Sequence, residues 1–266
     1  MADIFRNIQA GYELLMVDLS DPRTREFPMV KSPLPVLLLV VIYHYFVTDW
    51  GPKLMKNRAP MNIYYPMMIY NWVQIAVNGW FLFKCFKHIW LPGEYNLLCM
   101  PVDTSDSPTA NLTVRYVWVY FILKCVDLLD TVFMVLRKND RQVTYLHRYH
   151  HIIMVCGSWG TNKYFAGGHV ILFGTVNSFV HLVMFSYYQL MLIRPRNKKN
   201  VWWKKYITQL QLVQFVITTL HCLAALVQPS CPIPKFWLIV AIPQVIFMSV
   251  LFIDFYRKTY FSKKEQ

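Results

Sequence analysis

The amino-acid sequence predicts an all-α integral membrane protein with seven transmembrane helices, and three observations lead to this prediction. Only 15% of the 266 residues are charged and 56% are hydrophobic, whereas soluble domains carry about 25% charged residues. Apolar stretches of the length that a helix needs to cross a bilayer, about 20 residues, recur along the chain. Between them, the basic residues gather in short clusters, as is typical of loops at a membrane surface.

Seven apolar stretches form the predicted spans of one membrane domain that covers residues 1–266. They occupy residues 33–50, 63–86, 114–136, 150–167, 169–193, 206–227 and 236–256. The fourth stretch is the weakest, because it is short and contains small and polar residues. It is required nevertheless, because the segments 137–149 and 194–205 are both basic and should both lie in the cytosol. Two spans, the fourth and the fifth, must therefore separate them.

The distribution of Lys and Arg predicts the orientation. Segments 51–60, 137–149, 194–205 and 257–266 carry 17 of these residues together, whereas the N-terminal segment and the remaining loops carry 8. Basic loops stay in the cytosol, so we expect a cytosolic C-terminus and an N-terminus that is luminal or outside. The N-terminus has no basic region followed by an apolar core, and we expect no cleaved signal peptide. The net charge of +13 therefore indicates topology, and we expect no nucleic acid as a partner.

Three further features agree with this topology. Asn111 begins an N-glycosylation sequon in a predicted luminal loop. Among six cysteines only Cys99 and Cys231 lie in luminal loops, where oxidation is permitted, and they are the candidates for a disulfide. Lys263 and Lys264 near the chain end resemble the cytosolic dilysine retrieval signal of endoplasmic-reticulum membrane proteins, although a basic anchor for the last span is an alternative.

Four of the predicted spans carry polar residues at helical spacing, which is costly in lipid and marks functional positions. The fourth span begins with a histidine box, in which His147, His150 and His151 share one helix face. The third, fifth and sixth spans carry the other sets: Lys124, Asp127, Asp130 and Thr131; Asn177, His181, Met184 and Tyr188; Thr208, Gln211 and Gln214. At a rise of about 1.5 Å per residue, these positions lie in the cytosolic half or near mid-membrane. We expect them to line one chamber that is open to the cytosol.

Each polar set also has a purely structural interpretation. Lys124, Asp127 and Asp130 can form an ion-pair ladder, and the glutamines can hydrogen-bond between helices. For the histidines the alternative is a metal. Histidine boxes mark membrane di-iron desaturases and hydroxylases, but too few histidines remain here for several boxes. One zinc ion on three histidines is geometrically possible, yet three ligands on adjacent turns of one helix are crowded, and we predict no metal.

The chemistry that suits these imidazoles best is acyl transfer from a thioester. Neutral imidazole is a nucleophile near pH 7, and its attack on an acyl-CoA gives an acyl-imidazole, itself an acyl donor. A buried chamber protects that intermediate from water. The polyanionic CoA requires cations at the cytosolic mouth, and the candidates are Arg137, Lys138, Arg141, Lys198, Lys199, Lys204 and Lys205.

The polar sets resemble the successive signature boxes of the fatty-acid elongases, the condensing enzymes of very-long-chain fatty acid synthesis. The resemblance covers about residues 51–258 and rests on four boxes in order: Lys124-Cys-Val-Asp127-Leu-Leu-Asp130-Thr131, His147-Arg-Tyr-His150-His151, Asn177-Ser-Phe-Val-His181-Leu-Val-Met184-Phe-Ser-Tyr187-Tyr188 and Thr208-Gln-Leu-Gln211-Leu-Val-Gln214. Two positions depart from the family pattern. Asp127 replaces the usual glutamate and is one methylene shorter, which argues against a direct catalytic role for this carboxylate. Phe185 replaces the usual tyrosine, so a hydroxyl at this position is not essential to this protein.

The resemblance implies an endoplasmic-reticulum protein in which six helices ring a narrow acyl tunnel and the first helix is peripheral. It implies that a long-chain acyl-CoA and malonyl-CoA react in a ping-pong mechanism to give 3-oxoacyl-CoA, CoA and CO₂. No metal or redox cofactor is implied. The expected partners are the two CoA thioesters and the lipid bilayer, with a homodimer and other enzymes of the elongation cycle as possible further partners.

The resemblance also suggests a role for each candidate residue. His150 takes the acyl group, and His181 is an acid/base or a second covalent contact. His147 and His151 orient the nucleophile, while Asp130 and Asn177 bond an imidazole N–H or the developing oxyanion. The predicted substrate contacts are Lys124, Asp127, Tyr187, Tyr188, Gln211, Gln214, Arg137, Lys204 and Lys205.

Two rival classes share the topology, namely a heptahelical receptor and a non-enzymatic lipid transporter. A receptor would carry Asp/Glu-Arg-Tyr at the end of the third span and Asn-Pro-x-x-Tyr in the seventh. The third span ends in Leu136-Arg137-Lys138, and the seventh contains no such motif. A receptor also has no use for three histidines on one helix face.

Overall fold

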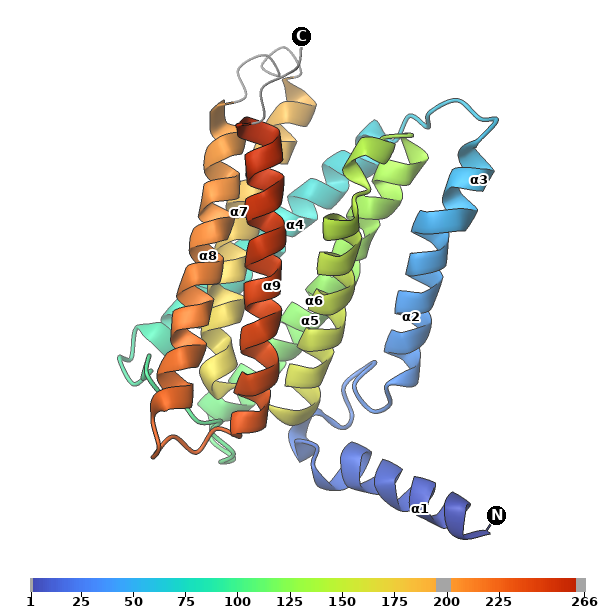
Figure 1. Ribbon diagram of the computed structural model, residues 1–266. Helices are drawn as coiled ribbons and strands as arrows, with labels where there is room; N and C mark the ends of the chain where they lie inside the picture. Colours follow the sequence, from blue (N-terminus) through green and yellow to red (C-terminus); the bar gives the residue numbers. More distant parts are fainter. Residues whose placement is uncertain (1, 195–201, 262–266) are drawn as a thin grey trace. The chain divides into compact units, whose positions relative to one another are not determined.

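A computed structural model of the chain describes residues 2–194 and 202–261 (Figure 1). Within these ranges the chain consists of α-helices, short 3₁₀- and π-helical segments and their connections, without a β-strand. The all-α prediction is therefore confirmed. Lys263 and Lys264, the predicted retrieval signal, lie outside the described residues.

Four helical segments of the described chain are long and apolar enough to cross a membrane: Leu34–Met55, Gly168–Ile193, Trp203–Val227 and Lys235–Tyr260. They correspond to the first, fifth, sixth and seventh predicted spans. The other three predicted spans, 63–86, 114–136 and 150–167, are also helical, but the polar side chains that they carry make them less apolar. The membrane character of the protein is thus supported, whereas the count of seven spans stays a prediction.

The chain divides into two compact units. The first unit (residues 1–61 and 102–170) contains α1 (Ala2–Glu13), α2 (Leu34–Tyr45), α3 (Gly51–Met55), α5 (Pro108–Leu136) and α6 (Tyr145–Tyr164). The second unit (residues 62–101 and 171–266) contains α4 (Tyr64–Cys85), α7 (Ile171–Ile193), α8 (Trp202–Val227) and α9 (Lys235–Tyr260). A single membrane domain stays a prediction.

Helices α5 and α6 begin before the predicted spans that they contain, 114–136 and 150–167. Ser107 is the N-cap of α5, where its Oγ accepts a hydrogen bond from the backbone N of Ala110 (3.1 Å). Thr144 caps α6 in the same way, with Oγ1 accepting from the backbone N of His147 (3.2 Å). A capping side chain satisfies one of the backbone N–H groups that lack a partner at a helix start. His147 therefore lies in the first turn of α6, ahead of the predicted membrane span that begins at residue 150.

Lys163 lies in the last turn of α6, where it is buried and its Nζ donates a hydrogen bond to the backbone O of Lys31 (3.3 Å). The backbone N of Asp21 donates to the backbone O of Lys163 (2.8 Å). These bonds attach the segment between α1 and α2 to the end of α6, while α1 itself runs crosswise to α2 (Figure 1).

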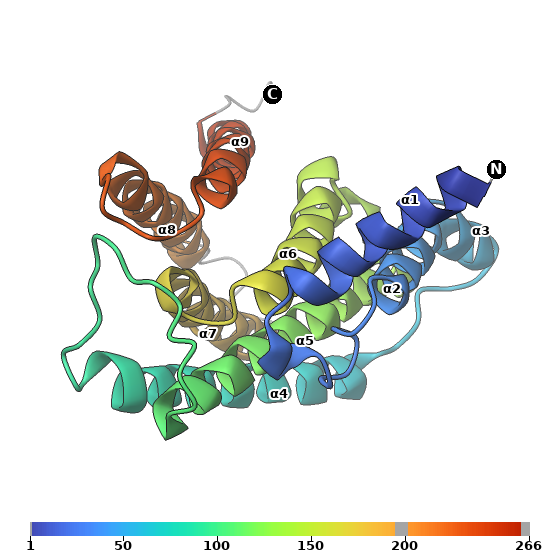
Figure 2. The ribbon, with the colours of Figure 1, turned by 90° about the horizontal axis from the view of Figure 1, so that it is seen from below.

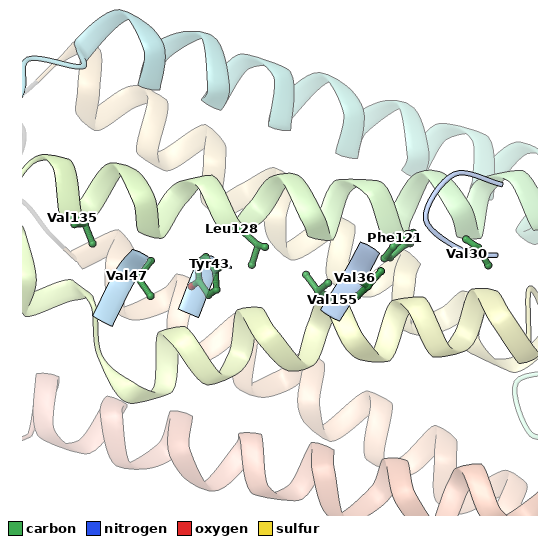
Figure 3. Packing of buried hydrophobic residues seen from close by; sticks show 8 residues of the cluster. All are labelled: Val30, Val36, Tyr43, Val47, Phe121, Leu128, Val135 and Val155. Carbon is green, nitrogen blue, oxygen red and sulfur yellow. The ribbon is translucent and has the colours of Figure 1, made fainter. Parts of the chain in front are cut away.

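The core of the first unit lies between α2, α5 and α6 (Figure 3). Its buried members recur at spacings of four and seven residues, which keeps them on one face of each helix. They are Val30, Val36, Tyr43, Val47, Phe121, Leu128, Val135 and Val155. A Cβ added to Gly51 would lie 2.7 Å from Cγ1 of Val135, so glycine permits α3 to approach α5. This packing holds α5 beside α6, the two helices that carry the first two polar boxes.

In the second unit, α4 packs against α7, and α8 packs against both α7 and α9. Figure 2 shows α8 and α9 side by side, nearly end-on. A disulfide joins Cys99, in the loop after α4, to Cys231 between α8 and α9, the two cysteines that the sequence analysis marks as candidates. The imidazole Nδ1 of His221 on α8 makes a hydrogen bond with the backbone O of Leu97 (2.8 Å). The loop after α4 is therefore attached to the end of α8.

Substitution of Phe121 tests the core of the first unit. This side chain is 0% exposed, so Phe121→Ala leaves a cavity, and we expect it to lower the free energy of unfolding by about 3 kcal/mol. The midpoint of thermal unfolding in detergent, followed by intrinsic fluorescence, measures the loss. Phe83 on α4, which is 60% exposed, is the control, and Phe83→Ala should leave the midpoint nearly unchanged. Equal shifts in both variants would contradict the described packing.

Candidate active site

The first box, on α5, contains an ion pair that is removed from solvent. Nζ of Lys124 lies 2.8 Å from Oδ2 of Asp127, and the two side chains are 1% and 4% exposed. The ammonium also lies 4.9 Å from the ring centroid of Tyr120, within the range of a cation–π contact. Because each charge compensates the other, the structural interpretation of these two residues is favoured over direct contact with substrate.

Asp130 lies one turn further along α5 and belongs to a different cluster. One carboxylate oxygen of Asp130 and one ring nitrogen each of His147 and His151 all lie within 4.8 Å of one another. His151 is buried, and the other two residues are half-buried. A carboxylate beside an imidazole favours the ring orientation that points an N–H toward it, and a hydrogen bond between the two would select the tautomer. The sequence analysis proposes this role for Asp130, and the geometry is compatible with it.

The three histidines of the box are in mutual contact on the face of α6. The ring centroids of His147 and His151 are 4.3 Å apart, and those of His150 and His151 are 5.6 Å apart with nearly perpendicular planes (80°). Nε2 of His147 is buried and makes no hydrogen bond within the described part of the chain. The spacing i, i+3, i+4 thus produces the shared face that the sequence predicts, in the first two turns of the helix.

A hydrogen bond from α2 supports this part of α5. The hydroxyls of Tyr43 and Thr131 lie 2.8 Å apart, and both residues are buried. Thr131 directly follows Asp130 in the chain, so the bond restrains the backbone that carries the carboxylate. Thr131 is the last residue of the first box, and its role here is in positioning rather than in chemistry.

Asp130, His147 and His151 are also the residues that can hold a metal ion. Two imidazoles and one carboxylate are suitable ligands for zinc or for ferrous iron. In residues 2–194 and 202–261 this is the one group of at least three His, Cys, Asp or Glu side chains with that spacing. A di-iron centre needs more ligands than one such group supplies, so the fit is limited to a single ion.

The third box lies on α7 in the second unit, where Asn177, His181, Phe185 and Gln189 are buried. The ring of Phe185 is surrounded by aromatic groups, with its centroid 5.6 Å from that of Tyr70, 5.7 Å from His181 and 5.8 Å from Tyr188. This position, where the family pattern has tyrosine, is therefore filled by aromatic packing. Tyr188 is 38% exposed and its ring lies 5.9 Å from that of the half-buried Tyr187.

The fourth box, on α8, connects to α7. Nε2 of Gln211 lies 3.7 Å from Sδ of Met184, a contact between the two helices. Gln214 is buried and borders a partly open apolar pocket of about 360 Å³. The pocket is lined by Leu82, Thr175, Val176, Phe179, Val180, Leu210, Val213, Gln214 and Ile217. Gln211 thus makes a contact between helices, Gln214 borders the pocket, and the substrate contacts of both stay predictions.

Three of the predicted cations and the sequon lie at the ends of helices, whereas Lys198 and Lys199 lie outside the described residues. Arg137 is exposed at the end of α5, and at the start of α8 Lys204 is exposed and Lys205 half-buried. Nζ of Lys205 lies 5.3 Å from the ring centroid of Phe261. Asn111 lies in the first turns of α5, where its Nδ2 donates a hydrogen bond to Oδ1 of Asp106 (2.8 Å). Its glycosylation stays a prediction.

The polar residues of α4 are absent from the sequence analysis. Asn71, Gln74 and Asn78 are buried in the second unit, and their spacing of three and four residues is the signal that could have identified them.

Boxes one and two lie in the first unit and boxes three and four in the second. A common chamber for all four boxes stays a prediction.

Comparison with known proteins decides the family. The family model described as "ELO: GNS1/SUR4 family" matches residues 28–266, which contain all four boxes. The chain belongs to this family. Among its relatives, "Very long chain fatty acid elongase 7" of Drosophila melanogaster is 38% identical over 94% of this chain and 76% of its own length. Membership confirms the resemblance to the fatty-acid elongases and, with it, a role in fatty acid elongation.

Two further elongases support this assignment. "Very long chain fatty acid elongase AAEL008004" of Aedes aegypti is 39% identical over 100% of this chain and 74% of its own length. "Very long chain fatty acid elongase 7" of Rattus norvegicus is 38% identical over 91% of this chain and 86% of its own length. The resemblance therefore extends over most of the chain and does not depend on the boxes alone.

The ion pair of the first box can be tested by comparing single and double variants. Lys124→Met leaves the Asp127 carboxylate buried without its ammonium partner, and we expect a loss of about 3–5 kcal/mol in stability. Lys124→Met combined with Asp127→Leu removes both charges and should restore most of that loss. Thermal unfolding in detergent measures both. A double variant as unstable as the single variant would show that mutual compensation is not the role of this pair.

Proposed function

We propose that the protein is a 3-oxoacyl-CoA synthase, which joins a long-chain acyl-CoA to malonyl-CoA with loss of CO₂. The observation that carries the proposal is the histidine box beside Asp130, in a chain of the elongase family. The box provides imidazoles in mutual contact, and the Asp130 carboxylate lies within 4.8 Å of a ring nitrogen of two of them. These are the groups that acyl transfer through nitrogen requires.

In the first half-reaction, the unprotonated ring nitrogen of His150 attacks the thioester carbonyl of the acyl-CoA. A C–N bond forms and the C–S bond breaks. CoA leaves as the thiol, with the proton that the other ring nitrogen gives up. His151 contacts His150 and lies beside Asp130. His151 and Asp130 are therefore placed to relay the proton and to keep the ring of His150 in its orientation. His147 completes the cluster.

In the second half-reaction, malonyl-CoA loses CO₂ and the resulting enolate attacks the acyl-imidazole carbonyl. A C–C bond forms and the C–N bond to His150 breaks. The imidazolate that is released takes up a proton from solvent, which replaces the proton that left with CoA. His181 serves as the acid/base of this step, or as a second covalent contact, and Asn177 donates a hydrogen bond to the oxyanion. Both side chains are buried on the same face of α7, where water is excluded.

The topology that we propose has seven spans, with six helices around an acyl tunnel and α2 outside the ring. The N-terminus is in the lumen of the endoplasmic reticulum and the C-terminus in the cytosol. Support comes from the positions of Lys and Arg, from the apolar helices and from family membership. Arg137, Lys204 and Lys205 bind CoA phosphates at the cytosolic mouth, while Tyr187, Tyr188, Gln211 and Gln214 contact the substrates.

Substitution of His150 tests the proposed nucleophile. Purified protein supplied with a long-chain acyl-CoA and labelled malonyl-CoA should release CO₂ and form 3-oxoacyl-CoA, and His150→Ala should reduce the rate by at least about 1,000-fold because the covalent step is lost. His44 is exposed on α2, and His44→Ala is the matched control that retains activity. Product formation by His150→Ala at the wild-type rate would exclude His150 as the acyl carrier.

Removal of metal tests the alternative use of Asp130, His147 and His151. The proposed reaction contains no redox step, so we expect enzyme dialysed against a strong chelator to keep its rate of 3-oxoacyl-CoA formation. Elemental analysis of the same sample should give much less than one metal ion per chain. A rate that falls with the metal content and returns when zinc or iron is added would favour the metal interpretation.

A further inference from the structure

The buried face of α4 is polar, which is unusual for a helix in a membrane protein. It is formed by Tyr70, Asn71, Gln74, Asn78, Phe81 and Cys85. The three carboxamides are 4%, 0% and 0% exposed, in chain order. Polar groups in such surroundings are costly unless they are bonded, and they mark functional positions. We refer to Asn71, Gln74 and Asn78 as the amide ladder.

Each member of the amide ladder makes hydrogen bonds, and Gln74 bonds neighbours on both sides along α4. Nε2 of Gln74 donates to the hydroxyl of Tyr70 (3.2 Å), and Nδ2 of Asn78 donates to Oε1 of Gln74 (3.2 Å). At one end, Nδ2 of Asn71 donates to Oε1 of Gln189 on α7 (3.2 Å). The carboxamide of Gln74 is thereby held from both sides, and its orientation is determined by its neighbours on the same helix.

Helix α7 runs antiparallel to α4, and contacts along both helices give their register. The rings of Tyr70 and Phe185 lie 5.6 Å apart, and a Cβ added to Gly79 would lie 3.9 Å from Cδ1 of Leu182. Further along, beyond the end of α4, Nε1 of Trp90 donates a hydrogen bond to Oγ1 of Thr175 (3.3 Å). Residue numbers therefore rise along α4 while they fall along α7.

This register places Gln74 at the level of His181. Gln74 follows Tyr70 by one helical turn, and His181 precedes Phe185 by one turn, on the stripe of α7 that meets α4. One turn further, Asn78 reaches the level of Asn177. His181 and Asn177, which take part in the proposed second half-reaction, are thus at the levels of Gln74 and Asn78, inside the second unit.

We propose that Gln74 is a positioning residue for His181. A carboxamide has two N–H donors and an oxygen with two lone pairs, and the bonds to Tyr70 and Asn78 use one donor and one lone pair. We assign the second N–H of Gln74 to a ring nitrogen of His181, so that the other ring nitrogen faces the reacting atoms. The inference rests on the proposed function, because it requires His181 to act in the second half-reaction.

A pair of variants on α4 separates positioning from stability. Gln74→Leu and Asn71→Leu each replace a buried carboxamide by an apolar side chain, but Asn71 bonds Gln189, two turns from His181 along α7. Both should lower the unfolding midpoint. Gln74→Leu alone should lower kcat for 3-oxoacyl-CoA formation, by about 10- to 100-fold as for the loss of other supporting hydrogen bonds, with KM for both CoA substrates unchanged.

The first half-reaction supplies the internal control. Release of CoA from acyl-CoA alone depends on His150, so it should continue at the wild-type rate in Gln74→Leu. Tyr70→Phe is a milder second variant, which keeps the ring and removes the hydroxyl that holds Gln74. It should lower kcat in the same way, by a smaller factor, even if Gln74→Leu does not fold.

The outcomes distinguish the two levels of the proposal. Equal loss of kcat in Gln74→Leu and Asn71→Leu, or wild-type kcat in Tyr70→Phe, would overturn the positioning role of Gln74. If the wild-type protein itself formed no 3-oxoacyl-CoA, the proposed function would fail before any variant is compared. A fall in kcat confined to Gln74→Leu and Tyr70→Phe, with KM and CoA release retained, is the expected result.

Discussion

Polar side chains inside apolar helices need partners from the same protein, and this constraint organises the structure. Water is not available to compensate a buried charge or amide, so neighbouring groups of the protein have to do so. Lys124 pairs with Asp127, Asp130 lies beside two imidazoles, Gln74 bonds Tyr70, and Asn71 bonds Gln189. Because several partners come from another helix, the same contacts that compensate polar groups also hold α5 beside α6 and align α4 with α7.

Much of the helical architecture could be predicted from the sequence, because apolar stretches of sufficient length separated by basic segments leave few alternatives. The helix starts could not be placed from hydrophobicity, since α5 and α6 extend beyond their apolar parts to the caps Ser107 and Thr144. The burial of Lys163 in the last turn of α6 could not be predicted either, because it depends on a hydrogen bond from its side chain to the backbone O of Lys31, far away in the chain.

Some features of the candidate site could be predicted from the sequence and others could not. Spacing along one helix predicted the shared face of His147, His150 and His151 and allowed the ion pair of Lys124 with Asp127, because both are local. Contacts between helices are tertiary and have no local signal, so the gathering of Asp130 with His147 and His151 appears only in the structure. The amide ladder could not be predicted for a related reason. A single Asn or Gln in a span is commonly a hydrogen-bonding group between helices, and nothing local marks it as part of a site.

The central claim is that an imidazole of the histidine box carries the fatty acyl group between two CoA thioesters. The most direct measurement incubates the protein with a long-chain acyl-CoA in the absence of malonyl-CoA, quenches it in acid and locates the added mass by peptide mass spectrometry. The claim predicts one acyl group on the His150 ring, which disappears when malonyl-CoA is added before the quench. An acyl group found only on cysteine or lysine, or none on any histidine while product still forms, would contradict it.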